Sequence, residues 1–99
     1  MYVENKNILS DEKVDKELEG LEGWEREGSV ISKAFIFEDF QEINSFLKFL
    51  VDSIIEKNHH PDFNLDTGKR TINISLTTHS ENAVTVSDID FARNLNSWT

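Results

Sequence analysis

Apolar residues recur at helical spacing over positions 39–57, the longest regular pattern in the chain. They fall on one face of a helix with 3.6 residues per turn: Ile43, Phe46, Leu47, Leu50 and Ile54. Phe40, Val51 and Ile55 widen this stripe beyond what contact with one sheet requires. We therefore expect a helix over 39–57 that either covers a second apolar surface, such as a partner subunit, or is buried more deeply in its own domain.

Two further helices are predicted, one near each end of the chain. The first begins after Ser10, a residue type that commonly caps helices, and ends near Gly20. The last begins at Thr85 and ends at about Asn96, because Thr85 and Asp88 have the spacing of a capping box.

Four segments between these helices have the composition of β-strands: 24–27, 30–37, 63–65 and 70–77. In the last segment, aliphatic residues at even positions alternate with polar residues at odd positions, which predicts a half-buried strand. The order is helix, strand, strand, helix, strand, strand, helix. This order predicts a two-layer α+β fold, in which an antiparallel four-stranded sheet has three helices packed on one face.

Length and charge narrow the classes of protein to which this chain can belong. Its 99 residues fit a single domain, which we place at residues 9–99 after a flexible N-terminal tail at 1–8. Nineteen acidic residues against ten basic ones give a net charge of −9. The resulting field opposes binding to nucleic acid or to an anionic membrane, so we expect no direct partner of either kind.

The chain contains no cysteine, which excludes disulfides, thiol catalysis and cysteine-ligated zinc together. Residues 1–13 are polar and charged and lack the apolar core of a signal peptide. No apolar run has the length needed to span a membrane. These features favour a cytoplasmic protein.

The histidines of the chain lie in two short segments, His59-His60 and His79. Imidazole suits proton transfer because its unperturbed pKa lies near neutrality. His60 precedes Pro61, which favours extended backbone, so the side chains of His59 and His60 are expected to point to opposite sides. His79 shares the parity of the polar face of the strand over 70–77. Two converging histidines could give and take protons at such a site without a metal or cofactor.

Three other interpretations stay open on residue pattern alone. The histidines could be surface residues. They could ligate zinc together with Asp62 or Asp88, although neighbouring side chains on extended backbone converge poorly on one ion and no HExxH helical pair is present. Asp88 could be no more than a capping residue of the last helix. The pattern thus indicates a histidine-centred site on a small α+β domain and names no substrate.

The chain also resembles a known family over residues 9–96. The matching pieces occur in the family's order: LSDE at 9–12, LEGW at 21–24, FIFEDF at 35–40, NHHPD at 58–62, ISLTTH at 74–79 and TVSD at 85–88. The HHP and TTH pieces are the most specific. On these motifs the sequence resembles the pterin-4a-carbinolamine dehydratases, also called dimerisation cofactor of hepatocyte nuclear factor.

The resemblance implies roles for particular residues. The family's three catalytic histidines match His59, His60 and His79. The first and third are usually assigned as the acid–base pair, and the second helps to bind the pterin. The implied substrate-binding positions are His60, Pro61, Asp62, Phe63, Thr78 and Asp88. The resemblance implies neither a metal nor a cofactor.

The implied reaction is the removal of water from 4a-hydroxytetrahydrobiopterin to give quinonoid dihydropterin, a step in the recycling of tetrahydrobiopterin. The family also implies a homodimer or homotetramer built through the 39–57 helix, in agreement with the wide apolar stripe. An alternative function is an interaction module that binds a transcription factor or a hydroxylase.

Three features depart from the family pattern. The position four residues before the first histidine is often acidic in the family and is Ile55 here, with Glu56 one step later. Phe63 stands where tryptophan is common, and the turn at 66–69 is longer than in the mammalian pattern. These departures bear on substrate preference or rate, and the preferred pterin side chain stays open.

Overall fold

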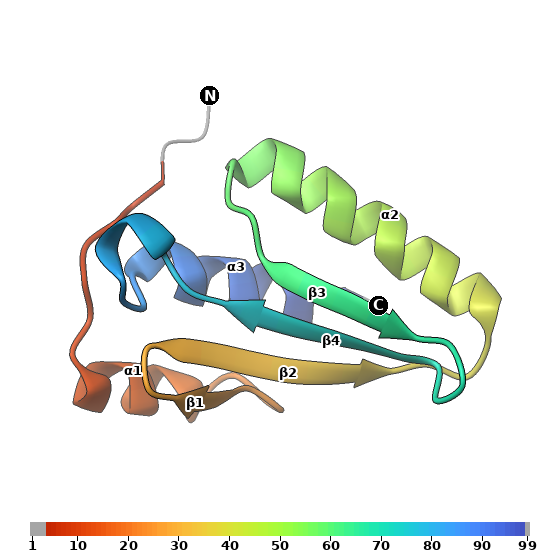
Figure 1. Cartoon of the computed structure of the whole chain (residues 1–99), viewed down its shortest axis with the longest axis horizontal. Coiled ribbons are helices and arrows are strands. Elements are labelled where there is room, and N and C mark those ends of the chain that lie inside the picture. The colour runs from red at the N-terminus through yellow and green to blue at the C-terminus, as the bar shows by residue number, and fades with distance from the viewer. Residues whose placement is uncertain (1–3, 99) are drawn as a thin grey trace.

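The computed structural model describes residues 4–98, which form a four-stranded sheet, three α-helices and a short 3₁₀ helix (Figure 1). In chain order the elements are α1 (Asp11–Leu18), β1 (Glu25–Glu27), β2 (Val30–Ile36), α2 (Phe40–Lys57), β3 (Asp62–Asp66), β4 (Thr71–Leu76), η1 (His79–Glu81) and α3 (Val86–Asn96). The sheet is antiparallel with strand order β1-β2-β4-β3, so the predicted α+β fold and its order of elements are confirmed. No helix within these residues is long and apolar enough to cross a membrane.

The two faces of the sheet differ in burial, as the alternation along β4 predicted. Ile31 of β2 pairs with Leu76 of β4. Both side chains are fully buried, as are those of Ile72 and Ile74 on β4. Several residues of opposite parity, such as Ser32, Ala34 and Asn73, are exposed. One face of the sheet is therefore apolar and must be covered by a second layer.

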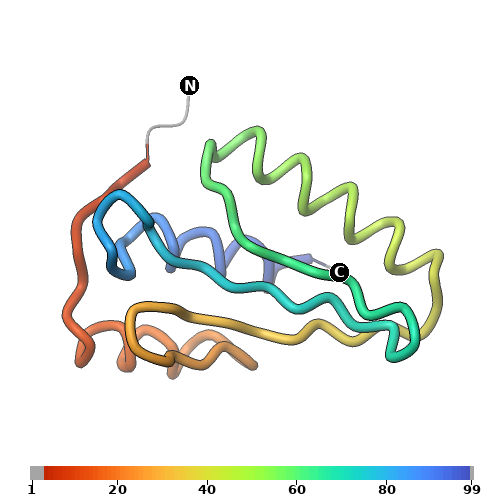
Figure 2. Tube along the Cα trace, viewed as in Figure 1, coloured from red at the N-terminus to blue at the C-terminus, as the bar shows by residue number. Residues whose placement is uncertain are grey.

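The helices supply that layer, and each contributes to a single apolar core. In Figures 1 and 2, α3 passes behind the sheet, α2 runs along its β3 side and α1 lies beside β1. Phe46 of α2 is fully buried. Its ring lies 4.9 Å from that of Phe35, 5.1 Å from that of Phe37 and 5.3 Å from that of Trp98. This aromatic cluster joins α2 to β2 and to the end of the chain.

Helices α1 and α2 each begin after a residue whose side chain caps the first turn. The Ser10 hydroxyl accepts the backbone N–H of Lys13 at 3.1 Å, and the Asp39 carboxylate accepts that of Glu42 at 2.9 Å. These bonds satisfy N–H groups that have no partner within a helix. Helix α2 begins one residue later than predicted, because Asp39 is its cap.

Residues 4–9 lie along the start of α3. The N–H groups of the first two residues of α3 donate to the carbonyls of Asn7 and Asn5, at 3.1 and 2.8 Å. Such groups have no acceptor within their own helix, so the N-terminal segment satisfies them. The sequence prediction of a flexible tail at 1–8 did not anticipate these bonds, and residues 1–3 lie outside the described part of the chain.

Replacing Phe46 with Ala is expected to lower the free energy of unfolding by about 3–5 kcal/mol, because it leaves a cavity at the centre of the aromatic cluster. Ser45→Ala truncates an exposed side chain on the same helix and is expected to cost less than about 1 kcal/mol. Urea unfolding followed by tryptophan fluorescence measures both values. Equal losses in the two variants would contradict this account of the core.

Candidate active site

The end of α2 determines how the two adjacent histidines are presented. Asn58 ends the helix in a left-handed conformation, with φ of 49°, which asparagine adopts more readily than most residues. His59 and His60 follow on non-helical backbone before Pro61. The side chain of His59 is buried, with 6% exposure, and that of His60 is exposed. The two neighbouring histidines therefore differ in burial.

His59 lies between two carboxylates. Its Nδ1 atom is 2.5 Å from Oε1 of Glu4, and its Nε2 atom is 2.5 Å from Oδ1 of Asp88. Its ring also packs against Phe91 of α3, with 5.8 Å between the ring centroids. Segments from the N-terminus, the end of α2 and the start of α3 therefore meet at one imidazole.

Asp88 is fully buried, and both of its carboxylate oxygens have partners. Its second oxygen, Oδ2, accepts the hydroxyl of Thr78 at 2.8 Å and the backbone N–H of Thr85 at 2.9 Å. The Thr78 and Thr85 hydroxyls lie 2.7 Å apart. The predicted capping interaction of Asp88 is confirmed, and the same side chain also binds a histidine.

The surroundings of His59 favour its protonated form. Burial alone lowers the pKa of an imidazole, because it penalises the charged state. The hydrogen bond and charge of Asp88, followed by those of Glu4, outweigh this effect and raise the pKa of His59 above its ordinary value of 6.5. With an N–H on each nitrogen, the imidazolium can donate to both carboxylates at once.

His79 begins η1, which follows β4 after two intervening residues, and is exposed. Its Nε2 atom is 3.7 Å from Oδ2 of Asp62, at the start of β3, and both side chains are largely exposed. An ion pair of this kind contributes little to stability. The His79 ring therefore has a solvent-facing position at the rim of the site, in contrast to the buried His59.

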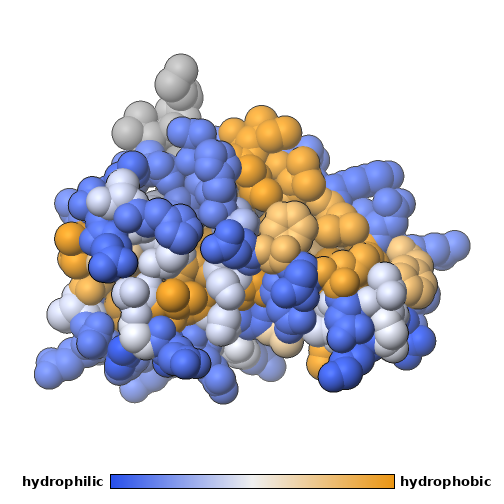
Figure 3. Space-filling view, in the orientation of Figure 1, coloured by the Kyte–Doolittle hydropathy of each residue, from blue (hydrophilic) through white to orange (hydrophobic). Residues whose placement is uncertain are grey.

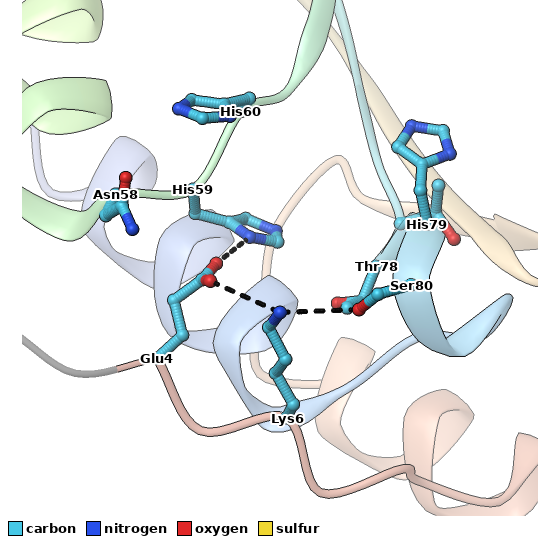
Figure 4. Close-up of a pocket in the computed structure, with 9 residues that line it drawn as sticks. Glu4, Lys6, Asn58, His59, His60, Thr78, His79 and Ser80 are labelled. Carbon is cyan, nitrogen blue, oxygen red and sulfur yellow. Dashed lines mark hydrogen bonds and ion pairs between the residues drawn. The ribbon is translucent and has the colours of Figure 1, made fainter.

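A cavity of about 280 Å³ brings these groups together (Figure 4). Its lining residues are Glu4, Lys6, Asn58, His59, His60, Thr77, Thr78, His79 and Ser80. Lys6 connects two parts of the wall, with its Nζ atom 3.3 Å from the Ser80 hydroxyl and 3.9 Å from Oε2 of Glu4. The cavity approaches the size range of small-molecule sites.

The site residues expected from the sequence occupy different positions around this cavity. His59, His60, Thr78 and His79 line it. Asp62 approaches His79, and Asp88 supports His59. Pro61 is buried, and Phe63 on β3 is 42% exposed; neither is among the lining residues.

Sequence reasoning missed Glu4, Lys6 and Ser80, which also line the cavity. Two of them lie in a segment that was expected to be a flexible tail. The local sequence of this segment does not predict that the carboxylate of Glu4 approaches the imidazole of His59, 55 residues later in the chain.

Residues 4–98 do not supply the ligands of a zinc site, because no three His, Asp or Glu side chains there are grouped so as to hold a metal ion. Each nitrogen of His59 already has a carboxylate partner. Asp88 uses its oxygens for that contact and for the cap of α3.

Comparison with known proteins decides the family. The model of the pterin 4 alpha carbinolamine dehydratase family matches residues 7–98, nearly the whole chain. The chain belongs to this family. The resemblance inferred from the short motifs is thereby confirmed, and all three histidines lie within the matched region.

Two relatives are provisionally named pterin-4-alpha-carbinolamine dehydratases. The protein from Mycobacterium avium is 35% identical over 89 residues, covering 90% of this chain and 93% of its own. The protein from Sulfurisphaera tokodaii is 33% identical over 87 residues, covering 88% and 91%. A crystal structure described as a transcriptional coactivator/pterin dehydratase from Brucella melitensis matches with a TM-score of 0.85 and 30% identity, covering 92% of this chain and 97% of that one.

The raised pKa of His59 predicts how stability changes with pH. An imidazolium held by carboxylates contributes stability that is fully present below the unfolded pKa of about 6.5 and is lost as the pH rises through the higher folded pKa. Each unit of difference corresponds to about 1.4 kcal/mol. The free energy of unfolding, measured in urea, should therefore fall above pH 6.5.

The variant His59→Asn should lose this dependence, and His60→Asn, which changes an exposed neighbour, should keep it. A wild-type stability that rises between pH 6.5 and 8.5 would contradict the assignment of His59 as an imidazolium.

Proposed function

We propose that this chain removes water from a 4a-hydroxytetrahydropterin by histidine acid–base catalysis. The observation that carries the proposal is the cavity of about 280 Å³ at which His59, His60 and His79 meet, in a chain of the pterin 4 alpha carbinolamine dehydratase family. The three side chains surround one space in Figure 4. Two come from the segment that follows α2, and the third comes from η1, which follows β4.

The reaction requires one proton to be given and another to be taken. Hydroxide leaves C4a poorly, so an acid donates a proton to its oxygen as the C–O bond breaks. The N5 proton passes to a base while the C4a–N5 double bond forms. The products are water and quinonoid dihydropterin, and proton exchange with solvent restores the acid and the base. No oxidation or reduction takes place.

His59 has the properties of the acid in this scheme. Two carboxylates favour its protonated form. Its Nε2 atom faces the buried Asp88, whereas its Nδ1 atom faces Glu4, a residue of the cavity wall. We assign the Nδ1–H to the leaving hydroxyl, with Glu4 giving up that hydrogen bond when substrate binds. His79, exposed at the rim, takes the N5 proton, and His60 binds the pterin.

Purified protein is expected to accelerate dehydration of 4a-hydroxytetrahydropterin, followed by ultraviolet absorbance. His59→Ala and His79→Ala should each lower the rate by about 10²–10⁴-fold, the usual contribution of general acid–base catalysis. Glu27→Gln, on the exposed end of β1, should retain the wild-type rate, and circular dichroism should confirm that each variant is folded.

A wild-type rate no higher than that of buffer would refute the enzyme assignment. Treatment with a chelator is expected to leave the activity unchanged, and a loss that zinc restores would refute the metal-free mechanism.

We propose that the protein acts in tetrahydrobiopterin recycling, where an aromatic amino-acid hydroxylase produces the carbinolamine. We propose that it acts in the cytoplasm. A role as an interaction module is the second candidate. The description of the Brucella melitensis structure as a coactivator as well as a dehydratase and the apolar surface described next favour it, and the two roles are compatible.

Large apolar side chains remain exposed around α2 and the adjoining strands. The space-filling view shows an apolar area on this side of the molecule (Figure 3), and the exposed apolar side chains of α2 and β3 are Phe40, Val51, Ile55, Phe63 and Leu65. Exposed apolar surface of this kind marks interaction sites. We propose that α2 forms the interface of a homodimer or homotetramer.

Val51→Glu combined with Ile55→Glu is expected to convert the oligomer into a monomer, because each change places a charge in the apolar interface. Ser45→Glu adds a charge at an exposed position of the same helix, away from this stripe, and should leave the oligomer intact. Light scattering coupled to size-exclusion chromatography gives the mass of each. A wild-type monomer at high concentration would contradict the proposal.

A further inference from the structure

The N-terminal segment places a carboxylate at the candidate active site. Glu4 lies 55 residues before His59, and its Oε1 atom is 2.5 Å from Nδ1 of that histidine. The Glu4 side chain is only 15% exposed, although Glu4 is the first residue that the structure describes. It lines the cavity with the histidines, and Figure 4 shows it beside His59.

Backbone hydrogen bonds fix the register that brings Glu4 to this position. The carbonyls of Asn5 and Asn7 accept N–H groups of α3, and the N–H of Leu9 donates to the carbonyl of Val84 at 3.1 Å. Ile8 also forms an isolated β-bridge. Glu4 directly precedes the first of these anchored residues. Its contact with His59 therefore follows from an extended segment tied to the protein at several points.

The charges of Glu4 and Asp88 determine which protonation state of His59 their contacts favour. A neutral imidazole has one N–H, so it can donate to only one of the two carboxylates that flank His59. An imidazolium donates to both, and each such charge-assisted bond is stronger than a neutral one. Asp88 supplies one carboxylate from the core and is tied to Thr78 and Thr85. Glu4 supplies the second from the cavity wall.

We propose that Glu4 is a positioning residue that holds His59 as an imidazolium with its Nδ1–H directed toward the cavity wall. The inference deepens the proposed function, on which its catalytic meaning rests. Glu4 is the replaceable partner in this arrangement, because it lies at the edge of the cavity, whereas Asp88 is fully buried. A substrate hydroxyl can take the place of its carboxylate, and Glu4 then returns to His59 after water has left.

Other charged groups around His59 fit this assignment. Lys6, from the same segment, approaches Oε2 of Glu4 at 3.9 Å and leaves Oε1 for the imidazole. His60 and His79 line the same cavity, and Asp62 lies against His79 rather than His59. Among the described residues, Glu4 and Asp88 are the carboxylates bonded to His59.

The test replaces Glu4 with Gln, which keeps the shape of the side chain and removes its charge. Titration of the His59 ring by NMR is expected to show its midpoint at a lower pH in Glu4→Gln than in the wild type. Glu12→Gln removes the same charge from an exposed position on α1, and should leave the His59 midpoint unchanged. The NMR measurement needs no substrate, so it is independent of the proposed activity.

The pH profile of dehydration provides the second measurement. Below both midpoints, where His59 is protonated in either protein, Glu4→Gln should turn over at close to the wild-type rate. Its activity should then decline at a lower pH than that of the wild type, by the same shift that NMR records. A merely structural role would lower the rate at every pH.

The outcomes separate the inference from the proposed function. An unchanged His59 midpoint in Glu4→Gln overturns the inference, even if the protein is an active dehydratase. A shifted midpoint in a protein without dehydratase activity supports the Glu4–His59 charge interaction and overturns the proposed function. A uniform loss of rate together with an unchanged midpoint leaves Glu4 as a structural residue and overturns its assigned role.

Discussion

The contact between Asp88 and His59 organises both the site and the surrounding fold. A fully buried carboxylate must be compensated by charge or hydrogen bonds within the protein. Asp88 receives both, from the imidazole on one oxygen and from Thr78 and Thr85 on the other. The end of α2, the end of β4 and the start of α3 are thereby held together at one point. Two residues that line the cavity, His59 and Thr78, are thus bonded to the same buried carboxylate.

The start of α3 is the point at which the N-terminal segment and the residues around His59 meet. Its first N–H groups have no acceptor in the helix, and the N-terminal segment supplies carbonyls for them. The same segment then continues to Glu4 and the second nitrogen of His59. Helix capping and the electrostatics of the site thus depend on one stretch of backbone. The other two histidines of the cavity, His60 and His79, are exposed, in contrast to His59.

The sequence was informative wherever the determining interactions are local. Alternation along 70–77 predicted which face of β4 is buried, because neighbouring side chains on a strand point to opposite faces. Thr85 and Asp88 predicted the start of α3, because capping involves residues three apart. His59 and His60 were expected to differ in direction, because Pro61 favours extended backbone. The family, too, could be inferred from short motifs in a fixed order.

By itself the sequence therefore determined the order of elements and the buried face of the sheet, and it predicted a site centred on three histidines. Only the tertiary structure decided that His59 lies between Asp88 and Glu4, and that Lys6 and Ser80 complete the cavity wall. The reason is physical. Spacing along the chain encodes contacts within one helix or strand, whereas a contact between residues 4 and 59 depends on how the N-terminal segment docks on α3. The local pattern of a polar N-terminal segment does not predict where that segment docks.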